Sequence, residues 1–521
     1  MMKKTVLALL IAVVMGVLLL TGCSTKEVET PVQQDTAAES TETKHANVGL
    51  FWVTATLDNT SGYTGWVLSR IGVAESLIRI TDEMKYEGLI AESWENDGDK
   101  TWKFTIRDKV TFSTGKKVDA EAVKKSIQRS LDLNERAGMI SQIDTMEADG
   151  QTITIITKEP YAALIGNLAE PLFAIIDVDA ENADFENAPI ATGPYVVEGF
   201  QPEESIEVVK SVNYWNGEVG LDAITFRHIP DSNTRTMAIQ SGEVDITGSI
   251  DQSQINVFKD NDNFIVDEIP SLRTLFAYIN HQSSVLSDLN IRKALSHAID
   301  RESYALLIGG TPGTGMFSNA LPFGNEKLKA DGFDPEKAKE ILDHAGYTDT
   351  KGDGIREMNG ENIVLEIYQT GAHGSSAPGI IAAAMQAQFK EIGIGAEIRT
   401  VENLNAIYEE GKFDITFSND NTGITADPQS FVQITYKADA TRNYGKYSNP
   451  EMDQYIESLN SVFDPQERYE IAAKISQIAI DDVANFYINY IPLNIVGNSR
   501  IKNLKQQPID YYMITPDIKM E

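Results

Sequence analysis

The chain has 521 residues, and its 77 aspartates and glutamates outnumber its 44 lysines and arginines, which gives a formal net charge of −33 at pH 7. Binding to nucleic-acid phosphates needs clustered basic side chains, so this charge argues against a nucleic-acid partner. With 42% hydrophobic residues, the chain is long enough to bury more than one core. Its single cysteine excludes an internal disulfide and a thiolate metal cluster.

The N-terminal segment predicts export and lipid attachment. Lys3 and Lys4 precede an apolar run, and Leu20 opens the sequence L-T-G-C that ends at Cys23. The run is short for a bilayer-spanning helix, and its basic flank is typical of a signal peptide. The L-T-G-C sequence resembles a bacterial lipobox, so we expect residues 1–22 to be a signal peptide and Cys23 to carry diacylglycerol and palmitate. We therefore expect an extracytoplasmic lipoprotein, anchored to the cell membrane in the periplasm or on the outer face of a bacterium.

The next segment predicts a tether. Residues 24–45 contain no aromatic residue, leucine or isoleucine. Such a segment buries too little apolar area to offset its ordering entropy. We expect residues 23–45 to be a disordered tether that spans roughly 25 Å as a flexible coil.

The stretch from 93 to 129 predicts a hairpin followed by a capped helix. Asn-Asp-Gly-Asp at 96–99 favours a tight turn, because these residues tolerate a positive φ. Trp102 begins an alternation of apolar and polar residues that is typical of a half-buried strand. Asp119 is placed to cap a helix whose apolar residues recur at helical spacing.

The rest of the body alternates between helical and strand patterns. In chain order, the other predicted elements are a strand from Val48, a helix and a short strand within 66–90, a hairpin over 144–158, a short helix over 162–168, a capped helix from Pro335, a helix over 377–392, a strand over 396–401, a strand opened by 411–415 that ends in a loop over 419–427, a capped helix after Asp464, and a strand over 486–496. This alternation predicts α/β lobes.

Three further motifs carry a family resemblance. Beside the stretch at 93–129, they are A-T-G-P-Y at 191–195, N-Y-W at 213–215, and R-K-A-L-S-H-A-I-D-R at 292–301. Together they resemble extracytoplasmic solute-binding proteins of family 5, the substrate-binding lipoproteins of peptide and nickel ABC importers. The resemblance implies an α/β, two-lobed periplasmic-binding-protein type II fold (cluster C), with an additional insertion domain and a hinge.

The resemblance also implies a division of the chain into parts. We expect lobe I to comprise residues 46–75, 190–275 and 490–521. Residues 76–189 would form the insertion subdomain, and residues 276–489 would form lobe II. The two passages between lobes, near 275 and 490, would make the hinge.

Catalytic and metal-binding patterns are weak in this sequence. The serines at 375–376 lack the final glycine of a nucleophile elbow, and the glycine-rich loop at 310–315 lacks the lysine of a phosphate loop. No histidine pair has zinc-site spacing. Residues 349–360 resemble a calcium loop, but Lys351 and Gly360 stand where oxygen ligands belong, which favours a hairpin. We expect no enzyme activity, no cofactor and no metal coordinated by the protein.

The resemblance suggests candidate ligand residues, and it leaves two ligand classes open. In nickel-binding relatives, arginines and tryptophans hold a metal chelate by its carboxylates. Arg136 matches one such arginine, and Met139 stands in place of a nearby tryptophan. No histidine occurs in 429–442, where the resemblance would place a nickel ligand. A guanidinium suits bidentate carboxylate recognition.

In peptide-binding relatives, an aspartate near a D-P-x-x-F motif receives the α-amino group of the peptide. Asp427 opens that motif here, Asp420 precedes it, and Asn419 lies beside them. Tyr490 on the returning strand is a further candidate, and so is Trp52, for which buried packing is the simpler interpretation. Each of these side chains has a structural interpretation beside the ligand-binding one.

The sequence thus predicts a solute receptor of an ABC importer. The leading ligand is a short peptide, a dipeptide or oligopeptide, captured in a cleft between the lobes. The alternative is nickel or a nickel chelate. The expected protein partners are the permease and ATPase subunits of the importer, and we expect the receptor itself to be a monomer.

Overall fold

We analysed a computed structural model, which describes residues 43–324, 327–370 and 376–521. These residues form one compact unit, Thr43–Glu521, and the prediction for Cys23 lies outside them. No helix among the described residues has the length and apolarity needed to cross a bilayer.

The first large sheet, which we call lobe I with its helices, has seven strands in the order β12-β21-β11-β1-β10-β9-β8. Their bounds are β1 His45–Leu50, β8 Tyr195–Gln201, β9 Ser205–Lys210, β10 Ala223–His228, β11 Ile246–Gly248, β12 Phe264–Ile269 and β21 Leu493–Asn498. The strand predicted from Val48 is therefore β1, which pairs in parallel with β10 and β11 in the middle of this sheet. Helices α1 Thr64–Arg70, α5 Ser232–Ser241 and α6 Gln252–Lys259 belong to this lobe.

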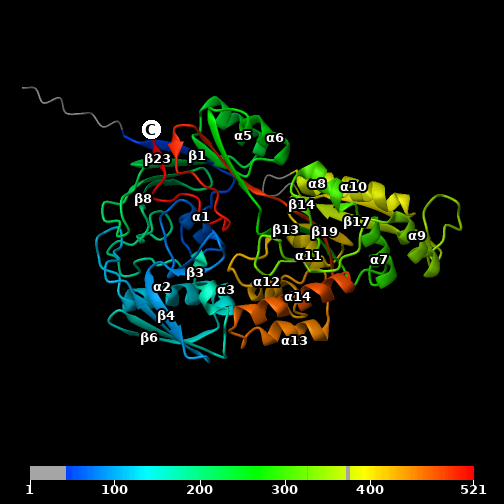
Figure 1. The fold of residues 1–521 in the computed structure, drawn as a ribbon, viewed down its shortest axis with the longest axis horizontal. Coiled ribbons are helices and arrows are strands. Elements are labelled where there is room, and N and C mark those ends of the chain that lie inside the picture. The colour runs from blue at the N-terminus through cyan, green and yellow to red at the C-terminus, as the bar shows by residue number, and fades with distance from the viewer. Residues whose placement is uncertain (1–42, 325–326, 371–375) are drawn as a thin grey trace, which may run out of the picture. The chain divides into compact units, whose positions relative to one another are not determined.

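The second large sheet, lobe II with its helices, has six strands in the order β14-β20-β13-β19-β17-β18. Their bounds are β13 Arg273–Ile279, β14 Thr311–Pro312, β17 Val364–Gln369, β18 Gly395–Thr400, β19 Ile415–Asn421 and β20 Asn485–Tyr490. The helices are α7 Leu289–Ala298, α8 Arg301–Ile308, α9 Pro335–His344, α10 Ala377–Glu391, α11 Asn405–Glu410, α12 Gln429–Thr435, α13 Pro450–Ser458 and α14 Pro465–Asp481. Figure 1 shows lobe I on the left and lobe II on the right.

The chain crosses between the two sheets twice. It leaves lobe I after β12 and enters lobe II at β13, and it returns between β20 and β21. The single strand predicted over 486–496 is wrong, because these residues form two strands in different sheets. Pro492 lies at this break and Pro270 at the other crossing, and proline has no N–H to donate to a sheet.

Residues 91–157 form a separate four-stranded sheet with the order β4-β5-β7-β6. Its elements are β4 Ala91–Asn96, β5 Thr101–Ile106, β6 Ile143–Asp149 and β7 Thr152–Thr157, with α2 Ala120–Leu133 and α3 Glu135–Ser141. The predicted hairpin and capped helix are confirmed: Trp102 is buried in β5, and the Asp119 carboxylate accepts the N–H of Ala122 at 2.8 Å. We call this part the insertion sheet.

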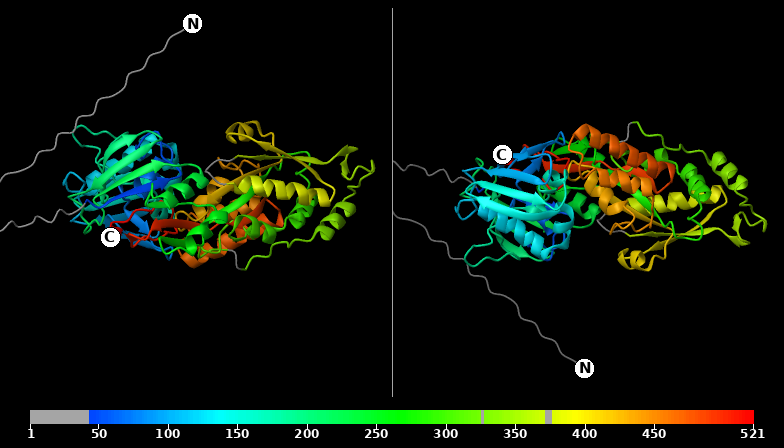
Figure 2. Two further views of the ribbon diagram at one scale, coloured as in Figure 1. Left: turned by 90° about the horizontal axis from the view of Figure 1, so that it is seen from above. Right: turned by 90° about the horizontal axis from the view of Figure 1, so that it is seen from below.

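The insertion sheet packs against lobe II as well as against lobe I. Its core is continuous with the buried faces of α12, α13 and α14. Trp102 lies 6.2 Å from Phe463 between ring centroids, and the Ser430 hydroxyl donates to the Asn167 side chain at 2.6 Å. Figure 1 and Figure 2 show the insertion sheet beside these helices. The remaining elements are short: β2 Ile78–Ile80, β3 Tyr86–Gly88, α4 Leu164–Asn167, a 3₁₀ turn Pro171–Phe173, β15 Glu357–Met358, β16 Glu361–Asn362, β22 Ile501–Lys502 and β23 Lys519–Met520.

Several local predictions can be compared directly with these bounds. The helices predicted from Pro335 and after Asp464 are confirmed as α9 and α14, each with its aspartate cap. The helix over 162–168 is shorter than predicted, because α4 has only four residues. The loop predicted over 419–427 begins later, because β19 continues to Asn421 through its pairing with β13.

Candidate functional site

Arg136 is the first component of a charged cluster between the lobes. Helix α3 is capped by Asn134, whose side chain accepts the N–H of Arg136 at 2.9 Å. The guanidinium pairs with the buried carboxylate of Glu170 at 2.6 and 2.8 Å and lies 4.5 Å from the centroid of the Tyr63 ring. Burial opposes the charge on Arg136, but the Glu170 carboxylate outweighs it and raises the arginine's pKa. The Arg136 guanidinium is thus held in position by Glu170 and stays protonated.

Arg442 is the second component, and it comes from lobe II. It lies between α12 and α13, and its backbone N–H donates to the carbonyl of Ile434 at 2.9 Å. Its guanidinium donates to the Asp420 carboxylate at 2.7 Å, and the Ser418 hydroxyl donates to the same carboxylate at 2.9 Å. The Asp420 charge raises the pKa of Arg442 further above its usual value. The charge of Arg442 lowers the pKa of Arg136, whereas Tyr63 contributes to raising the pKa of both arginines.

Aromatic side chains surround these two ion pairs. On the lobe I side, Tyr63 meets Trp66 edge to face at 5.7 Å. On the lobe II side, the rings of Tyr408 and Tyr444 stack at 3.8 Å with an interplanar angle of 2°. Tyr278 packs against that pair, and its buried hydroxyl has no hydrogen-bond partner among the described residues. Aromatic faces of this kind stabilise neighbouring guanidiniums and bind flat ligand groups.

A third charged group joins the lobes at the hinge. Arg273, the first residue of β13, donates to the Asp510 carboxylate at 3.0 and 2.5 Å. Arg70 of α1 donates to the backbone carbonyl of Asp510 at 3.1 and 2.8 Å. Burial opposes ionisation of Asp510, but the two arginines outweigh it and lower its pKa. The hinge carboxylate is therefore held ionised between both lobes.

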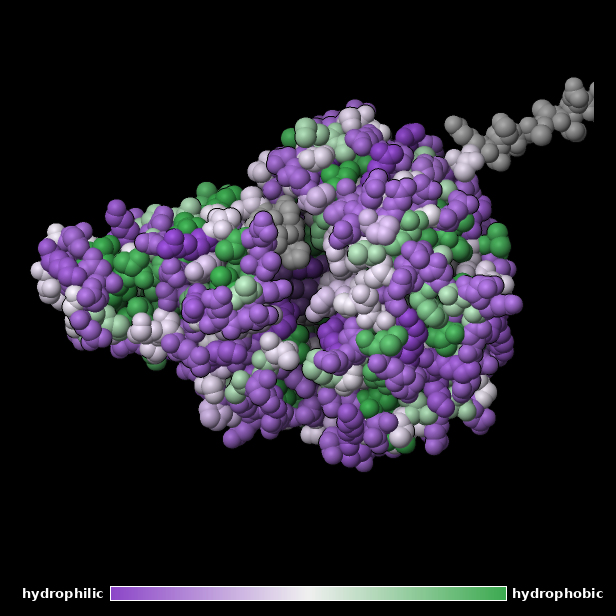
Figure 3. All heavy atoms as spheres, turned by 180° about the vertical axis from the view of Figure 1, so that it is seen from behind, coloured by the Kyte–Doolittle hydropathy of each residue, from purple (hydrophilic) through white to green (hydrophobic). Residues whose placement is uncertain are grey.

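The cluster carries a surplus of positive charge in an otherwise acidic protein. Its four arginines face three carboxylates, those of Glu170, Asp420 and Asp510. Figure 3 shows the surface hollowed between the two lobes and lined there by hydrophilic residues. Fixed guanidiniums at an enclosed site favour an anionic group, above all a carboxylate. This arrangement can bind a charged solute, but it holds no nucleophile–base pair.

The described residues contain no group of three or more histidine, cysteine, aspartate or glutamate side chains that could hold a metal ion.

A family model described as "Bacterial extracellular solute-binding proteins, family 5 Middle" matches residues 85–443. This match spans more than half of the chain. The chain belongs to this family.

The chain resembles members of the family with different named ligands. It is 30% identical over 450 residues to the nickel-binding protein NikA of Staphylococcus aureus, covering 85% of this chain and 88% of the relative. It is 26% identical over 421 residues to the glutathione-binding protein GsiB of Escherichia coli K12, covering 76% and 78%. A crystal structure of S. aureus NikA in complex with Ni(L-His)2 matches with a TM-score of 0.80 and 28% identity, covering 92% of this chain and all of that one.

Membership confirms the predicted fold class and the predicted general function. This family 5 protein is a solute-binding protein of an ABC importer, and such proteins are extracytoplasmic transport receptors that work with a permease and an ATPase. Relatives named for nickel and for a peptide both occur, so membership alone leaves the ligand class open. The geometry of the charged cluster must therefore decide between ligands.

Two of the predicted ligand residues, Arg136 and Asp420, belong to the ion pairs of the charged cluster: Arg136 pairs with Glu170, and Asp420 pairs with Arg442. Asn419 is next to them in β19, where its carbonyl accepts from Arg273 at 2.9 Å. Met139 lies exposed on α3, three residues beyond Arg136. Ligand contact by each of these side chains stays a prediction.

Three other predicted residues are engaged within the protein. The Asp427 carboxylate receives Arg468 at 2.7 and 2.6 Å and the N–H of Gln429 at 2.8 Å. The Tyr490 hydroxyl donates to the carbonyl of Gly315 at 3.0 Å and accepts backbone N–H groups of the same loop. Trp52 packs against the core of lobe I. Contact of Asp427 or Tyr490 with a ligand would require these buried side chains to rearrange.

Sequence reasoning missed Arg442 and Glu170 as site residues. Arg442 is the last residue of the stretch 429–442, where the resemblance would place a nickel-binding histidine. An arginine at that end of the stretch was therefore the available signal of a ligand-binding residue. Glu170 had no such signal, because its role depends on a partner more than thirty residues away.

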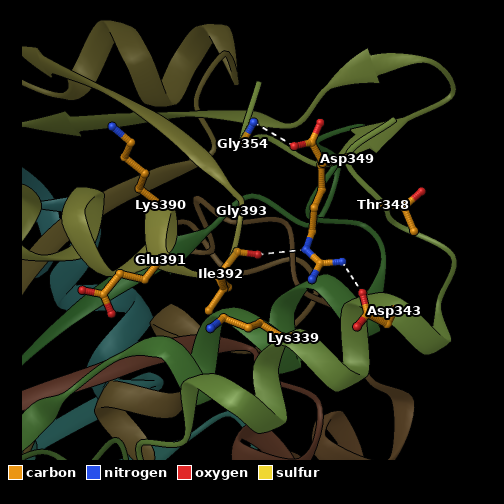
Figure 4. Close-up of a pocket in the computed structure, with 10 residues that line it drawn as sticks. Lys339, Asp343, Thr348, Asp349, Gly354, Lys390, Glu391, Ile392 and Gly393 are labelled. Atoms are coloured by element: carbon orange, nitrogen blue, oxygen red, sulfur yellow. Dashed lines mark hydrogen bonds and ion pairs between the residues drawn. The ribbon is translucent and has the colours of Figure 1, made fainter. Parts of the chain in front are cut away.

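A separate cavity of about 330 Å³ lies at the far end of lobe II, beside α9 and α10. Arg356 lines it and donates to the carbonyl of Ile392 at 2.9 Å and to Asp343 at 2.5 Å, and Figure 4 shows Ile392 and Asp343 at this cavity. The Asp349 carboxylate accepts backbone N–H groups of the loop that resembled a calcium site, including that of Gly354 at 2.8 Å. The predicted hairpin is confirmed as β15 and β16. These groups are already paired within the protein, so the cavity is not assigned a ligand.

Proposed function

We propose that this receptor captures a metal chelate that carries carboxylates, of the nickel–amino-acid type, and delivers it to the permease. The proposal includes a lipid anchor at Cys23, supported by the L-T-G-C sequence, and a monomeric receptor on the outer face of the membrane. The nickel ligands would belong to the chelate itself. The named ligand of the S. aureus relative, Ni(L-His)2, is a complex of this type.

The observation that carries the proposal is the placement of Arg136 and Arg442. They come from the insertion sheet and from lobe II, a glutamate or aspartate holds each one, and the Arg136 guanidinium lies over the ring of Tyr63. Arg442 donates to Asp420 through Nη2, and its Nε and Nη1 have no hydrogen-bond partner among the described residues. A ligand carboxylate placed there would bond to the insertion sheet and to lobe II at once.

A short peptide is the second candidate, favoured by the similarity to the glutathione-binding relatives. The aspartates that would receive its α-amino group already have arginine partners: Asp420 pairs with Arg442, and Asp427 pairs with Arg468. A peptide amine would have to compete with these guanidiniums. The peptide carboxylate, by contrast, would fit the same arginines as a chelate.

Calorimetric titration of residues 43–521 tests the proposal, because these residues form one compact unit. The titrants are preformed nickel–L-histidine, nickel chloride, L-histidine and glutathione. We expect nickel–L-histidine to bind with a Kd near or below about 1 μM, a binding free energy of about −8 kcal/mol, and the others at least tenfold more weakly. Tighter binding of glutathione than of nickel–L-histidine would favour the peptide receptor instead.

A further inference from the structure

Four helices of the two lobes present exposed apolar side chains on one side of the molecule. In lobe II, Leu306 and Leu307 in the last turn of α8 are 87% and 54% exposed. In lobe I, Met237 of α5 and Val257 of α6 are 59% and 53% exposed. Figure 1 shows α5, α6, α8 and α10 together at the top, on the side away from β4 and β6. Single exposed apolar residues are common, but a cluster of them marks an interaction site.

Contacts between these helices join the residues into one surface. Within lobe I, the Thr236 hydroxyl donates to Gln254 at 2.7 Å, so Met237 and Val257 flank the same junction. Between the lobes, the start of α6 meets the end of α8, where Gln252 packs against Gly309. We call this surface, formed by the exposed faces of α5, α6 and α8 with the first turn of α10, the bridging face.

A second interlobe contact lies next to the first, one residue earlier in lobe I. The hydroxyl of Ser376, which precedes α10, donates to the Asp251 carboxylate at 3.4 Å. Ile380 in the first turn of α10 is also exposed. The apolar side chains of the two lobes therefore form one surface when the lobes are in contact.

The bridging face differs from the rest of the protein in charge. The chain has 77 acidic residues in 521, yet α5 and α6 contain none and α8 contains one, Glu302; the carboxylates nearest to these helices are those of the aspartates at their caps, Asp231, Asp251, Asp260 and Asp300. Lys259 stands at the end of α6, where it pairs with Glu268. An acidic body is repelled by anionic lipid headgroups, so a face poor in carboxylates is the face that can approach a membrane.

We propose that the bridging face docks on the extracytoplasmic surface of the importer's permease. The inference rests on the importer role of the family and deepens it by assigning the surface. A bare lipid surface fits less well, because interfacial helices carry many lysines and arginines beside aromatic residues. A face split between two lobes also lets the permease distinguish the closed receptor, since both halves bind together only when the lobes meet.

Photo-crosslinking in the living cell tests this assignment without reference to the ligand. A benzoylphenylalanine replaces Leu306 or Met237 in the full-length lipoprotein, and Val212, 89% exposed between β9 and β10, serves as the control position. We expect adducts at 306 and 237 that mass spectrometry identifies as the permease, and none at 212. Adducts with lipid or a second copy alone, no adduct, or equal yield at 212 would overturn the proposal.

A second measurement separates this surface from the ligand site. We expect Leu306→Glu and Met237→Glu to keep the affinity of the purified protein for nickel–L-histidine within twofold. Uptake of radioactive nickel by cells carrying either variant should fall at least tenfold, whereas Val212→Glu should leave uptake unchanged. Normal uptake by both variants would overturn the docking surface. If the wild type fails to bind nickel–L-histidine, the proposed ligand is wrong, and the crosslinks still decide the docking surface.

Discussion

The guanidinium of Arg442 donates to the carboxylate of Asp420 at 2.7 Å, and this bond joins a loop of lobe II to the end of its strand β19. Asp420 also accepts from Ser418, so the aspartate is held by two donors. The pair therefore presents a fixed arginine to the space between the lobes, where the sequence had suggested a free carboxylate.

Replacing Arg442 with glutamine should abolish tight binding of an anionic ligand. The variant loses a charge-assisted donor and leaves Asp420 without its cation, a change that costs about 2–5 kcal/mol when a binding pair is truncated. We expect the Kd for nickel–L-histidine to rise at least thirtyfold by calorimetry. Arg399→Gln, which removes an exposed arginine of β18, is the matched control and should bind normally. Equal affinities of the two variants would contradict a role for Arg442.

Replacing Asp427 with asparagine tests whether that residue serves the fold or the ligand. Its partner Arg468 is almost fully buried, and removing one member of a buried pair costs about 3–5 kcal/mol. We expect a large loss of free energy of unfolding in urea, with ligand affinity unchanged below the transition. Asp439→Asn, at an exposed aspartate, should change stability by at most about 1 kcal/mol. A stable variant with weakened peptide binding would instead support Asp427 as a ligand residue.

Local features of the fold were predictable from the sequence, because they depend on neighbouring residues. Asp119, Asp334 and Asp464 cap the helices that follow them, each by accepting an N–H three residues ahead. The break at Pro492 was also present in the sequence, but the apolar run on both sides favoured one strand. Its division between two sheets follows from the hinge, which is a property of the whole chain.

The charged cluster was less predictable, because its pairs join distant parts of the chain. Arg136 was identified through the family resemblance, but its partner Glu170 was not, and neither was the position of Arg442 across the cleft. Which carboxylates are free depends on such pairings. Asp420 and Asp427 were ligand candidates while their arginine partners were unknown.

The pH dependence of stability should reveal the buried carboxyl of Glu75. Burial raises the pKa of Glu75 to about 7, although Trp215 and Tyr214 donate to it at 2.9 and 3.0 Å. Below about pH 4.5 the group is protonated in both folded and unfolded states. As the pH rises to about 7 the carboxyl ionises first in the unfolded state, so its contribution to stability is lost over this window, by about 3 kcal/mol.

We expect Glu75→Gln to flatten this part of the pH profile, measured by urea denaturation between pH 5 and 8. The quantity compared is the slope of the free energy of unfolding against pH. Its absolute value also changes, because the amide alters the hydrogen bonds with Trp215 and Tyr214. Glu92→Gln, at an exposed glutamate of β4, is the control and should keep the wild-type slope. If Glu75→Gln keeps that slope too, this carboxyl does not set the pH dependence.

Replacing Gly309 with alanine should keep the lobes apart. The residue has a φ of +78°, and an added Cβ would lie 2.3 Å from Cγ of Gln252 in the other lobe. Gly242, at the end of α5, has a φ of +77° and no atom within 4 Å of its added Cβ, so Gly242→Ala controls for a positive φ without the interlobe clash. Gly242→Ala should lose about 1 kcal/mol of stability, and Gly309→Ala more, because the ψ of 177° at Gly309 places it in a region essentially restricted to glycine. We expect Gly309→Ala alone to show a larger radius of gyration in X-ray scattering and a weaker Kd for nickel–L-histidine, by about tenfold. Identical scattering from the two variants would mean that the contact between α6 and α8 does not limit closure.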